Sequence, residues 1–273
     1  MKQFIATTCL FMFCFISSAQ TTALRLSTGY NFSAGSQYFL SELEGSTGNY
    51  TYQRVDASLG RGINVAAGVD YLCKDWLGFS LDISYLKTAP PVKGNTEFNT
   101  VVDYSYSEEN KWRSNIAEVS PALLLKIPGK KLNPYSRFGL LIPFYSKIKV
   151  TADYTSRSFA MVTTGKKTTI FRLQSTLGYT ATAGIAPEIN KKLSFVAEAR
   201  LLSHAIRVKK STLTSDIVNG TERADSYLVA QKEVIYVKKA DNQPYNGNEP
   251  RKELAFSLPY SSIGLTVGLS IKL

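Results

Sequence analysis

The feature that most constrains this chain is a strict alternation of apolar residues with small or polar ones. The last twelve residues, 262–273, show it most clearly, because six apolar side chains stand at alternate positions with glycine, serine, threonine or lysine between them. Successive side chains of a β-strand point to opposite faces of the sheet. Such a segment is therefore predicted to be a strand whose two faces meet different surroundings.

The same alternation recurs seven more times, and the connections between these segments alternate strictly in length. Three connections are short, and four are long, roughly 34–61, 88–115, 148–172 and 205–258. A soluble sandwich has no reason to sort its connections in this way, whereas transmembrane barrels have short turns at one end and long loops at the other. The predicted strands are 23–32, 62–73, 76–87, 117–127, 135–147, 177–189, 193–204 and 262–273.

We therefore predict an all-β protein, a closed antiparallel transmembrane β-barrel of eight strands. Each segment reaches the length of about 9–11 residues that a tilted strand needs to cross a bilayer. Closure of the sheet pairs every backbone N–H and C=O, as the hydrocarbon region requires. Strand-like stretches within the long connections, 98–107 and 226–239, leave ten strands as an alternative. Pro121, Pro143 and Pro187 predict bulges or strand ends, because proline lacks a ladder donor.

The first 19 residues predict a cleaved signal peptide. Lys2 precedes an apolar run over residues 4–16, and small residues end the segment before Gln20. This arrangement is typical of secretory signal peptides. The predicted organisation is thus a signal peptide at 1–19, followed by a barrel with four long extracellular loops at 20–273.

The polar faces of the predicted strands bring charges of both signs into the interior of the barrel. An eight-stranded barrel is just wide enough for side chains to fill it. Charges taken out of water need partners, so we expect a salt-bridged plug and not an open pore. An ion or proton pathway is the alternative. The predicted lumen charges are Arg25, Asp70, Asp82, Glu118, Lys126, Arg137, Glu188, Glu198 and Arg200.

The last strand carries a second signal. Thr266, Gly268, Ile271 and Leu273 fit the pattern polar-x-Gly-x-x-hydrophobic-x-hydrophobic, although an aromatic residue usually ends it. With its eight segments, the chain resembles the small outer-membrane β-barrel proteins of the OmpA/OmpX type, as found in Bacteroidota-like exported proteomes. The resemblance covers essentially the whole chain after the signal peptide. It implies a bacterial outer-membrane location, contact with outer-membrane lipid and lipopolysaccharide, and recognition of the last strand by barrel-assembly machinery.

Catalytic constellations are scarce in the sequence. The single histidine, His204, follows Ser203, and adjacent strand residues point to opposite faces, so the two do not form a base and nucleophile. We therefore predict no enzyme activity, no cofactor and no metal site, with His204 in the lumen or at the rim. The net charge of +11 suits anionic lipid headgroups or surface polysaccharide, and without a binding motif we expect no nucleic-acid partner.

The long loops hold the function that the sequence suggests, because mobile polar loops on a rigid scaffold commonly bind ligands. We predict a non-enzymatic outer-membrane barrel, either structural or presenting its loops to an extracellular ligand, adhesion target or protein partner. Three alternatives stay open: an accessory subunit of an outer-membrane secretion or motility complex, a membrane-embedded lipid-modifying enzyme, and a narrow channel.

Overall fold

The alternating segments form strands that pair with one another in a ring. Each ring strand is antiparallel to both of its neighbours, and the last strand pairs with the first. The computed structural model describes residues 21–34, 38–46, 49–99, 104–129, 132–174, 176–240 and 247–273, and the predicted signal peptide lies outside them. In ring order the strands are β1 (Thr21–Ser33), β4 (Gly62–Leu72), β5 (Leu77–Thr88), β7 (Tyr104–Lys126), β8 (Pro134–Ser158), β10 (Gly178–Ile185), β11 (Leu193–Ser203) and β17 (Ser262–Lys272).

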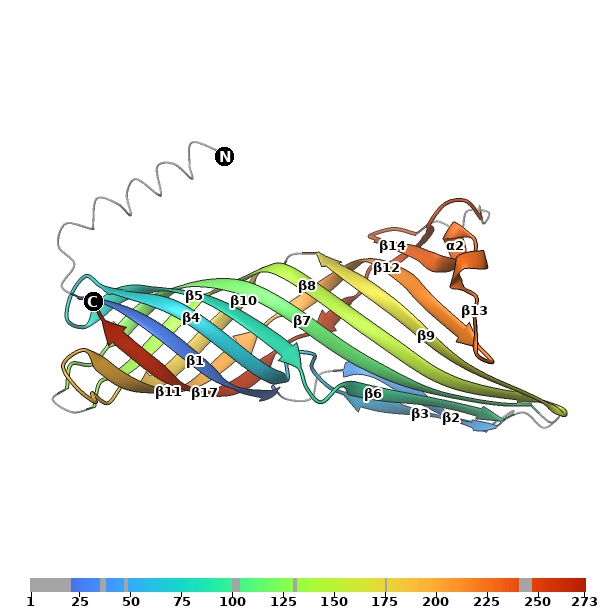
Figure 1. The fold of residues 1–273 in the computed structure, drawn as a ribbon, viewed down its shortest axis with the longest axis horizontal. Helices are drawn as coiled ribbons and strands as arrows, with labels where there is room; N and C mark the ends of the chain where they lie inside the picture. Colours follow the sequence, from blue (N-terminus) through green and yellow to red (C-terminus); the bar gives the residue numbers. More distant parts are fainter. Residues whose placement is uncertain are drawn as a thin grey trace.

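The ring lies at one end of an elongated molecule, and the C-terminus lies at the same end (Figure 1). The turns from β4 to β5, from β7 to β8 and from β10 to β11 are also at this end. The seam between the first and last strands is continuous from Ala23 opposite Lys272 to Ser33 opposite Ser262. Because every ring strand has two neighbours, none of the eight is an edge strand. The prediction of an eight-stranded antiparallel barrel is confirmed.

Pro143 and Pro187 lie next to a bulge and beyond a strand end, as predicted, whereas Pro121 lies in the middle of β7. In the β7–β8 pair the register shifts where Ala117 faces Tyr145 and Glu118 faces Pro143, so that Phe144 is the extra residue of a bulge. Pro121 keeps its partner on β5, but the β7–β8 ladder skips it. Pro187 follows the end of β10. Pro121 is tolerated inside β7 because the β7–β8 ladder skips this position, where its missing N–H would otherwise be needed.

Ring strands bury their polar face and expose their apolar face. On β5 the small and acidic residues Ser80 and Asp82 are buried inside the ring, whereas Phe79, Leu81 and Ile83 are about half exposed on its outside. A soluble sheet packed on a core shows the opposite arrangement. The sequence pattern is therefore that of a sheet with its polar side enclosed.

Beyond the ring, β7 and β8 continue as single strands of 23 and 25 residues and carry a second sheet. Its order is β3–β2–β6–β7–β8–β9–β12–β14–β15, with parallel pairs β2–β6 and β14–β15. We call this sheet and its attached segments the platform. Its further elements are β2 (Tyr38–Ser46), β3 (Asn49–Asp56), β6 (Val92–Asn99), β9 (Met161–Gln174), β12 (Ala205–Val218), β13 (Thr221–Glu222), β14 (Glu233–Val237), β15 (Arg251–Leu254), β16 (Ser257–Pro259), the 3₁₀ helix η2 (Ala224–Ser226) and α2 (Val229–Lys232).

The long connections predicted as loops are thus largely strands, and the bulge at Phe144 explains their different packing. Before the bulge, β8 turns Phe138 and Leu140 outward; after it, Ile148 and Val150 are buried. One extra residue moves the following side chains to the opposite face. The platform therefore has an apolar inside, as a soluble sheet does. This core comprises Phe39, Ala57, Leu59, Leu86, Val92, Ile116, Ile148, Val150, Phe171, Ile206, Val208, Leu258 and Tyr260.

Candidate functional site

Arg25 and Arg137 form the centre of a charge cluster inside the ring. The guanidinium of Arg25 pairs with Asp70 and Asp82, and its Nε lies 3.6 Å from Oε1 of Glu198. Arg137 shares two of these acids, because its Nη1 donates to Oδ2 of Asp82 at 2.9 Å and its Nη2 pairs with Glu198. Both arginine side chains are only 3% exposed. Two cations are thus enclosed among three carboxylates contributed by different strands.

A separate pair lies elsewhere in the lumen. Arg200 Nη2 is 3.5 Å from Oε1 of Glu118, which also accepts a hydrogen bond of 3.0 Å from the hydroxyl of Ser84. The Nε of Arg200 donates to Oγ1 of Thr180 at 3.3 Å. Buried ions of this kind require both a counter-charge and additional hydrogen bonds. The pair and the Arg25–Arg137 cluster together fill the ring with paired polar side chains, which is the geometry of a plug.

Two of the predicted lumen charges, Glu188 and Lys126, lie near the end of the ring that carries the short turns. β10 ends at Ile185, so Glu188 is exposed outside the interior and accepts a hydrogen bond of 2.5 Å from Nζ of Lys272. Lys126 is the last residue of β7, and it lines a small cavity together with the lumen residues Arg25 and Asp70, where it is half-buried. Placing Glu188 in the lumen was wrong, because the sequence alternation continues past Ile185, where β10 ends.

The four residues of the predicted assembly signal lie on both faces of β17. Thr266 points inward, and its hydroxyl donates to Oε2 of Glu198 at 3.3 Å. At Gly268 the neighbouring β1 comes so close that a Cβ would lie 2.1 Å from a carbonyl oxygen of that strand, which only glycine tolerates. Ile271 and Leu273 are exposed on the outside. Recognition of this strand by assembly machinery stays a prediction.

His204 is buried at the junction of β11 and β12. Its Nε2 lies 2.9 Å from both the carbonyl oxygen and the hydroxyl oxygen of Thr176. Ser203 points to the outer surface, so the two side chains lie on opposite sides of the sheet. Among the described residues, no group of three or more histidine, cysteine or acidic side chains is placed to hold a metal ion.

The outside of the ring is a continuous apolar surface, which we call the belt. Every ring strand contributes exposed large apolar side chains to it. A monomeric soluble protein rarely exposes a contiguous apolar patch larger than a few hundred Å². The belt comprises Leu24, Leu26, Ile63, Val65, Val69, Phe79, Leu81, Ile83, Tyr85, Leu123, Phe138, Leu140, Tyr179, Ile185, Phe195, Leu201, Ile263, Leu265, Val267, Leu269 and Ile271.

A ring of paired strands with an apolar outside and an ionic inside is built for hydrocarbon solvent, because all of its backbone polar groups are satisfied within the sheet. The protein is a transmembrane β-barrel of the outer-membrane type. Within the described residues, no helix is both long enough and apolar enough to cross a membrane.

Comparison with known proteins gives no sequence relative. No protein-family model matches the chain, and no curated protein sequence does so. Among solved structures, the barrel is similar to Neisserial surface protein A, with 9% identity, a TM-score of 0.40, and 92% of this chain and 97% of the other covered. It is also similar to Ail, the attachment invasion locus protein of Yersinia pestis, with 9% identity, a TM-score of 0.30, and 93% and 97% covered. Likenesses this distant carry no argument about function.

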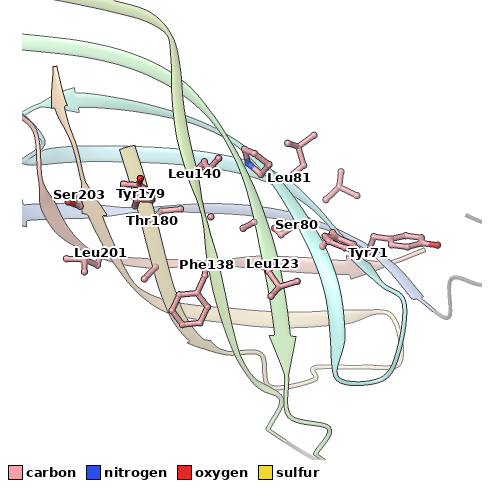
Figure 2. A pocket seen from close by; sticks show the side chains of 16 residues that line it. Tyr71, Ser80, Leu81, Leu123, Phe138, Leu140, Tyr179, Thr180, Leu201 and Ser203 are labelled. Carbon is pink, nitrogen blue, oxygen red and sulfur yellow. The ribbon is translucent and has the colours of Figure 1, made fainter. Parts of the chain in front are cut away.

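A broad groove of about 1230 Å³ crosses the belt (Figure 2). The small residues Pro121 and Ala181 line it together with larger side chains such as Leu123, Phe138 and Tyr179. Its lining is almost entirely apolar and belongs to the surface that faces hydrocarbon. The barrel in a membrane is expected to have lipid chains here, so the groove is part of the belt and not a separate ligand pocket.

The platform extends away from the ring to a narrow tip at the turn between β8 and β9 (Figure 1). Ser158 faces Met161 across this two-residue turn, and Phe159 has a φ of 53°. A positive φ is uncommon for a bulky residue, and turns of this kind favour glycine or asparagine. Phe159 and Met161 are nevertheless 74% and 71% exposed, and Val162 beside them is exposed too. The tip is not apparent in the sequence, where residues 148–172 are predicted only as a long loop.

Glu222 fixes a turn on the platform. Its carboxylate accepts hydrogen bonds from the hydroxyl of Ser215 at 2.5 Å and from the backbone N–H groups of Asp216 and Ala224 at 2.7 and 2.9 Å. These donors, the serine hydroxyl first, lower the pKa of Glu222 from 4.5 to about 2. The turn after β12 is therefore held by a charged carboxylate on the surface.

Proposed function

We propose that the protein is a non-enzymatic barrel of the bacterial outer membrane that anchors the platform and presents its β8–β9 tip to a ligand outside the cell. The observation that carries this proposal is the exposed apolar tip. Phe159 occupies a backbone conformation that costs free energy, and because it is 74% exposed, packing offsets little of that cost. Strained positions of this kind concentrate where proteins bind their ligands.

The lumen supports an anchoring role over transport. Arg25 and Arg137 are enclosed with their counter-ions, and Arg200 is paired with Glu118 in the same interior. Above this plug, the apolar core of the platform includes Ile116 and Tyr260, which are fully buried. Paired charges in one layer and apolar packing in the next favour a closed interior, so we expect no steady conductance from the protein in planar bilayers.

The faces of β11 support a non-enzymatic role. Ser203 faces the belt side and His204 the interior, where Thr176 occupies the Nε2 side of the ring. A nucleophile needs its base within hydrogen-bond reach. His204→Gln is therefore expected to leave the composition of the membrane lipids unchanged. A difference in lipid acylation between cells with the two proteins would favour the lipid-modifying enzyme instead.

The adhesion proposal is tested with cells that display the full chain. The variant Phe159→Asn with Met161→Ser removes the apolar tip, while asparagine suits the positive φ and so keeps the turn. The control Tyr52→Ser with Leu254→Ser removes two equally exposed apolar side chains at other places on the platform. The probes are immobilised fibronectin, laminin and collagen, together with a layer of the same cells.

We expect adherence of the tip variant to fall by about tenfold, as loss of a binding hot spot on the order of 1.4 kcal/mol implies. The control should adhere like the unmodified protein. Equal adherence of tip and control variants, or no adherence above that of cells lacking the protein, would refute the presentation of a ligand-binding tip.

A further inference from the structure

A second groove, of about 550 Å³, opens on the outer surface between β8 and β9. Phe144 and Tyr145 line one part of it, and Lys147 and Arg172 line another. Phe144 is the bulge residue at which β8 leaves the belt, and both aromatic side chains are exposed. The groove therefore spans the boundary between the belt and the platform, with apolar groups on the belt side and cations beyond them.

Three basic residues face one another directly across this part of the sheet. Arg172 on β9 is opposite Lys147 on β8 and also opposite Lys210 on β12. Directly opposed like charges destabilise an antiparallel pair. Lys210 is neutralised by Glu233 at 2.8 Å, but in the part of the chain that the structure describes neither Lys147 nor Arg172 has an ion-pair partner. An anion in the groove would relieve this repulsion.

The same boundary is basic on other strands. The first exposed charged residue beyond the belt is Lys87 on β5, Arg113 on β7, Lys147 on β8 and Arg207 on β12. Acidic side chains of the same strands, such as Asp153, come farther from the belt. A band of cations along the edge of the belt suits a plane of anions and not a single soluble molecule.

We propose that the groove binds the phosphate group of an anionic lipid in the leaflet on the platform side. The guanidinium of Arg172 offers two parallel N–H donors to phosphate oxygens, and Lys147 adds a point charge. The lipid's acyl chain lies against Phe144 and Tyr145 and continues onto the belt. This site is independent of the β8–β9 tip and of any ligand bound there.

The test uses the full chain folded into nanodiscs of phosphatidylcholine with a minor fraction of bisphosphorylated lipid A. Native mass spectrometry measures how much lipid A stays bound as its fraction is varied. The variant is Lys147→Gln with Arg172→Gln. Its control is Arg157→Gln with Lys166→Gln, which removes the same charge from exposed positions farther out on the same hairpin. Heat-modifiable gel mobility shows that each variant is folded, and the single variants K147Q and R172Q serve if the double variant folds poorly.

Each cation near an anionic surface raises the binding affinity about fivefold. The double variant should therefore bind lipid A about 30-fold more weakly, while the affinity of the control is unchanged. A second arm titrates inorganic phosphate against the protein in pure phosphatidylcholine nanodiscs, where we expect no comparable binding. Equal loss in variant and control would mean general charge attraction and would overturn the site. Phosphate binding as tight as that of lipid A, and lost in the double variant, would assign the groove to a soluble anion and overturn the lipid proposal.

Discussion

Arg200→Met removes a buried charge while keeping most of the side-chain bulk, and it leaves Glu118 without its counter-ion. The two side chains are 7% and 3% exposed, and their charged atoms are 3.5 Å apart. At that distance Coulomb's law with an effective dielectric of about 20 gives an attraction of about 4.7 kcal/mol. Breaking a buried pair from one side typically costs about 3–5 kcal/mol. We therefore expect the free energy of unfolding to fall by about 4 kcal/mol.

The double variant Arg200→Met with Glu118→Gln distinguishes the energetic effect of this ion pair from other effects of changing the lumen. It removes both charges, and the glutamine carbonyl can still accept the hydrogen bond from Ser84. Replacing both members of a buried ion pair often leaves the free energy of unfolding nearly unchanged. The double variant should therefore lower it by about 1 kcal/mol or less. It should thus be about 3 kcal/mol more stable than Arg200→Met alone.

The assay is urea unfolding of the protein in lipid vesicles, followed by heat-modifiable gel mobility and by tryptophan fluorescence. The single variant Glu118→Gln completes the cycle. If Arg200→Met and the double variant lose equal stability, Glu118 is not left uncompensated when Arg200 is removed. In that case water reaches the lumen, and the description of the interior as a dry, paired plug is wrong.

Three further predictions test the faces, the platform and the topology. Leu269→Arg should lower the free energy of unfolding by up to about 2–4 kcal/mol because this side chain faces hydrocarbon, whereas Ser270→Arg on the other face should lower it less. If both variants lost the same stability in the same unfolding assay, the belt would not face hydrocarbon. The pKa of Glu222 is lower in the folded protein than in the unfolded chain, so its contribution is complete above pH 4.5 and is lost as the pH falls toward about 2. The protection factor of amide exchange at this turn, which corrects for the intrinsic pH dependence of exchange, should fall over that range in the unmodified protein and not in Glu222→Gln. An unchanged profile in that variant would assign the effect to another group. In a background without the native cysteine, a cysteine at Phe159 should be labelled on whole cells and one at Asn190 should not, and the reverse labelling would invert the orientation.

The ring could be predicted from the sequence because its strands have different solvents on their two faces. Residues 77–85 alternate without exception, and the structure gives them as part of β5 (Leu77–Thr88). The short turns also left few ways to connect neighbouring strands. Where a segment alternated strictly and a short turn joined it to the next, the strand predicted from the sequence agreed with the one in the structure.

The platform was missed because its sequence pattern does not reveal the change of face. Phe138, Leu140, Ile148 and Val150 all stand at even positions, so the alternation seems to continue through β8 unchanged. The bulge at Phe144 turns the first two toward lipid and the last two toward the core. Only the pairing with β7 determines that extra residue, and a single sequence does not show it.

The lumen was predictable in composition but not in pairing. Alternation brings Arg25 and Asp82 to the interior, yet these two lie on β1 and β5, which are not neighbours in the ring. Which charges meet depends on the stagger of all the strands between them. The groove at Arg172 has the same origin, since its opposition to Lys147 follows from the register of β8 and β9.

The continuity of β8 also has a mechanical consequence. A force that pulls on the tip is carried along one covalent backbone from Ser158 into the ring at Pro134. Within the platform this strand is hydrogen-bonded to β7 on one side and β9 on the other, and within the ring to β7 and β10. Pulling it out requires both ladders to shear at once, because the load lies along the strand and does not open the bonds one after another. A cell held by this tip in flowing liquid would thus be held through the stiffest direction of the sheet.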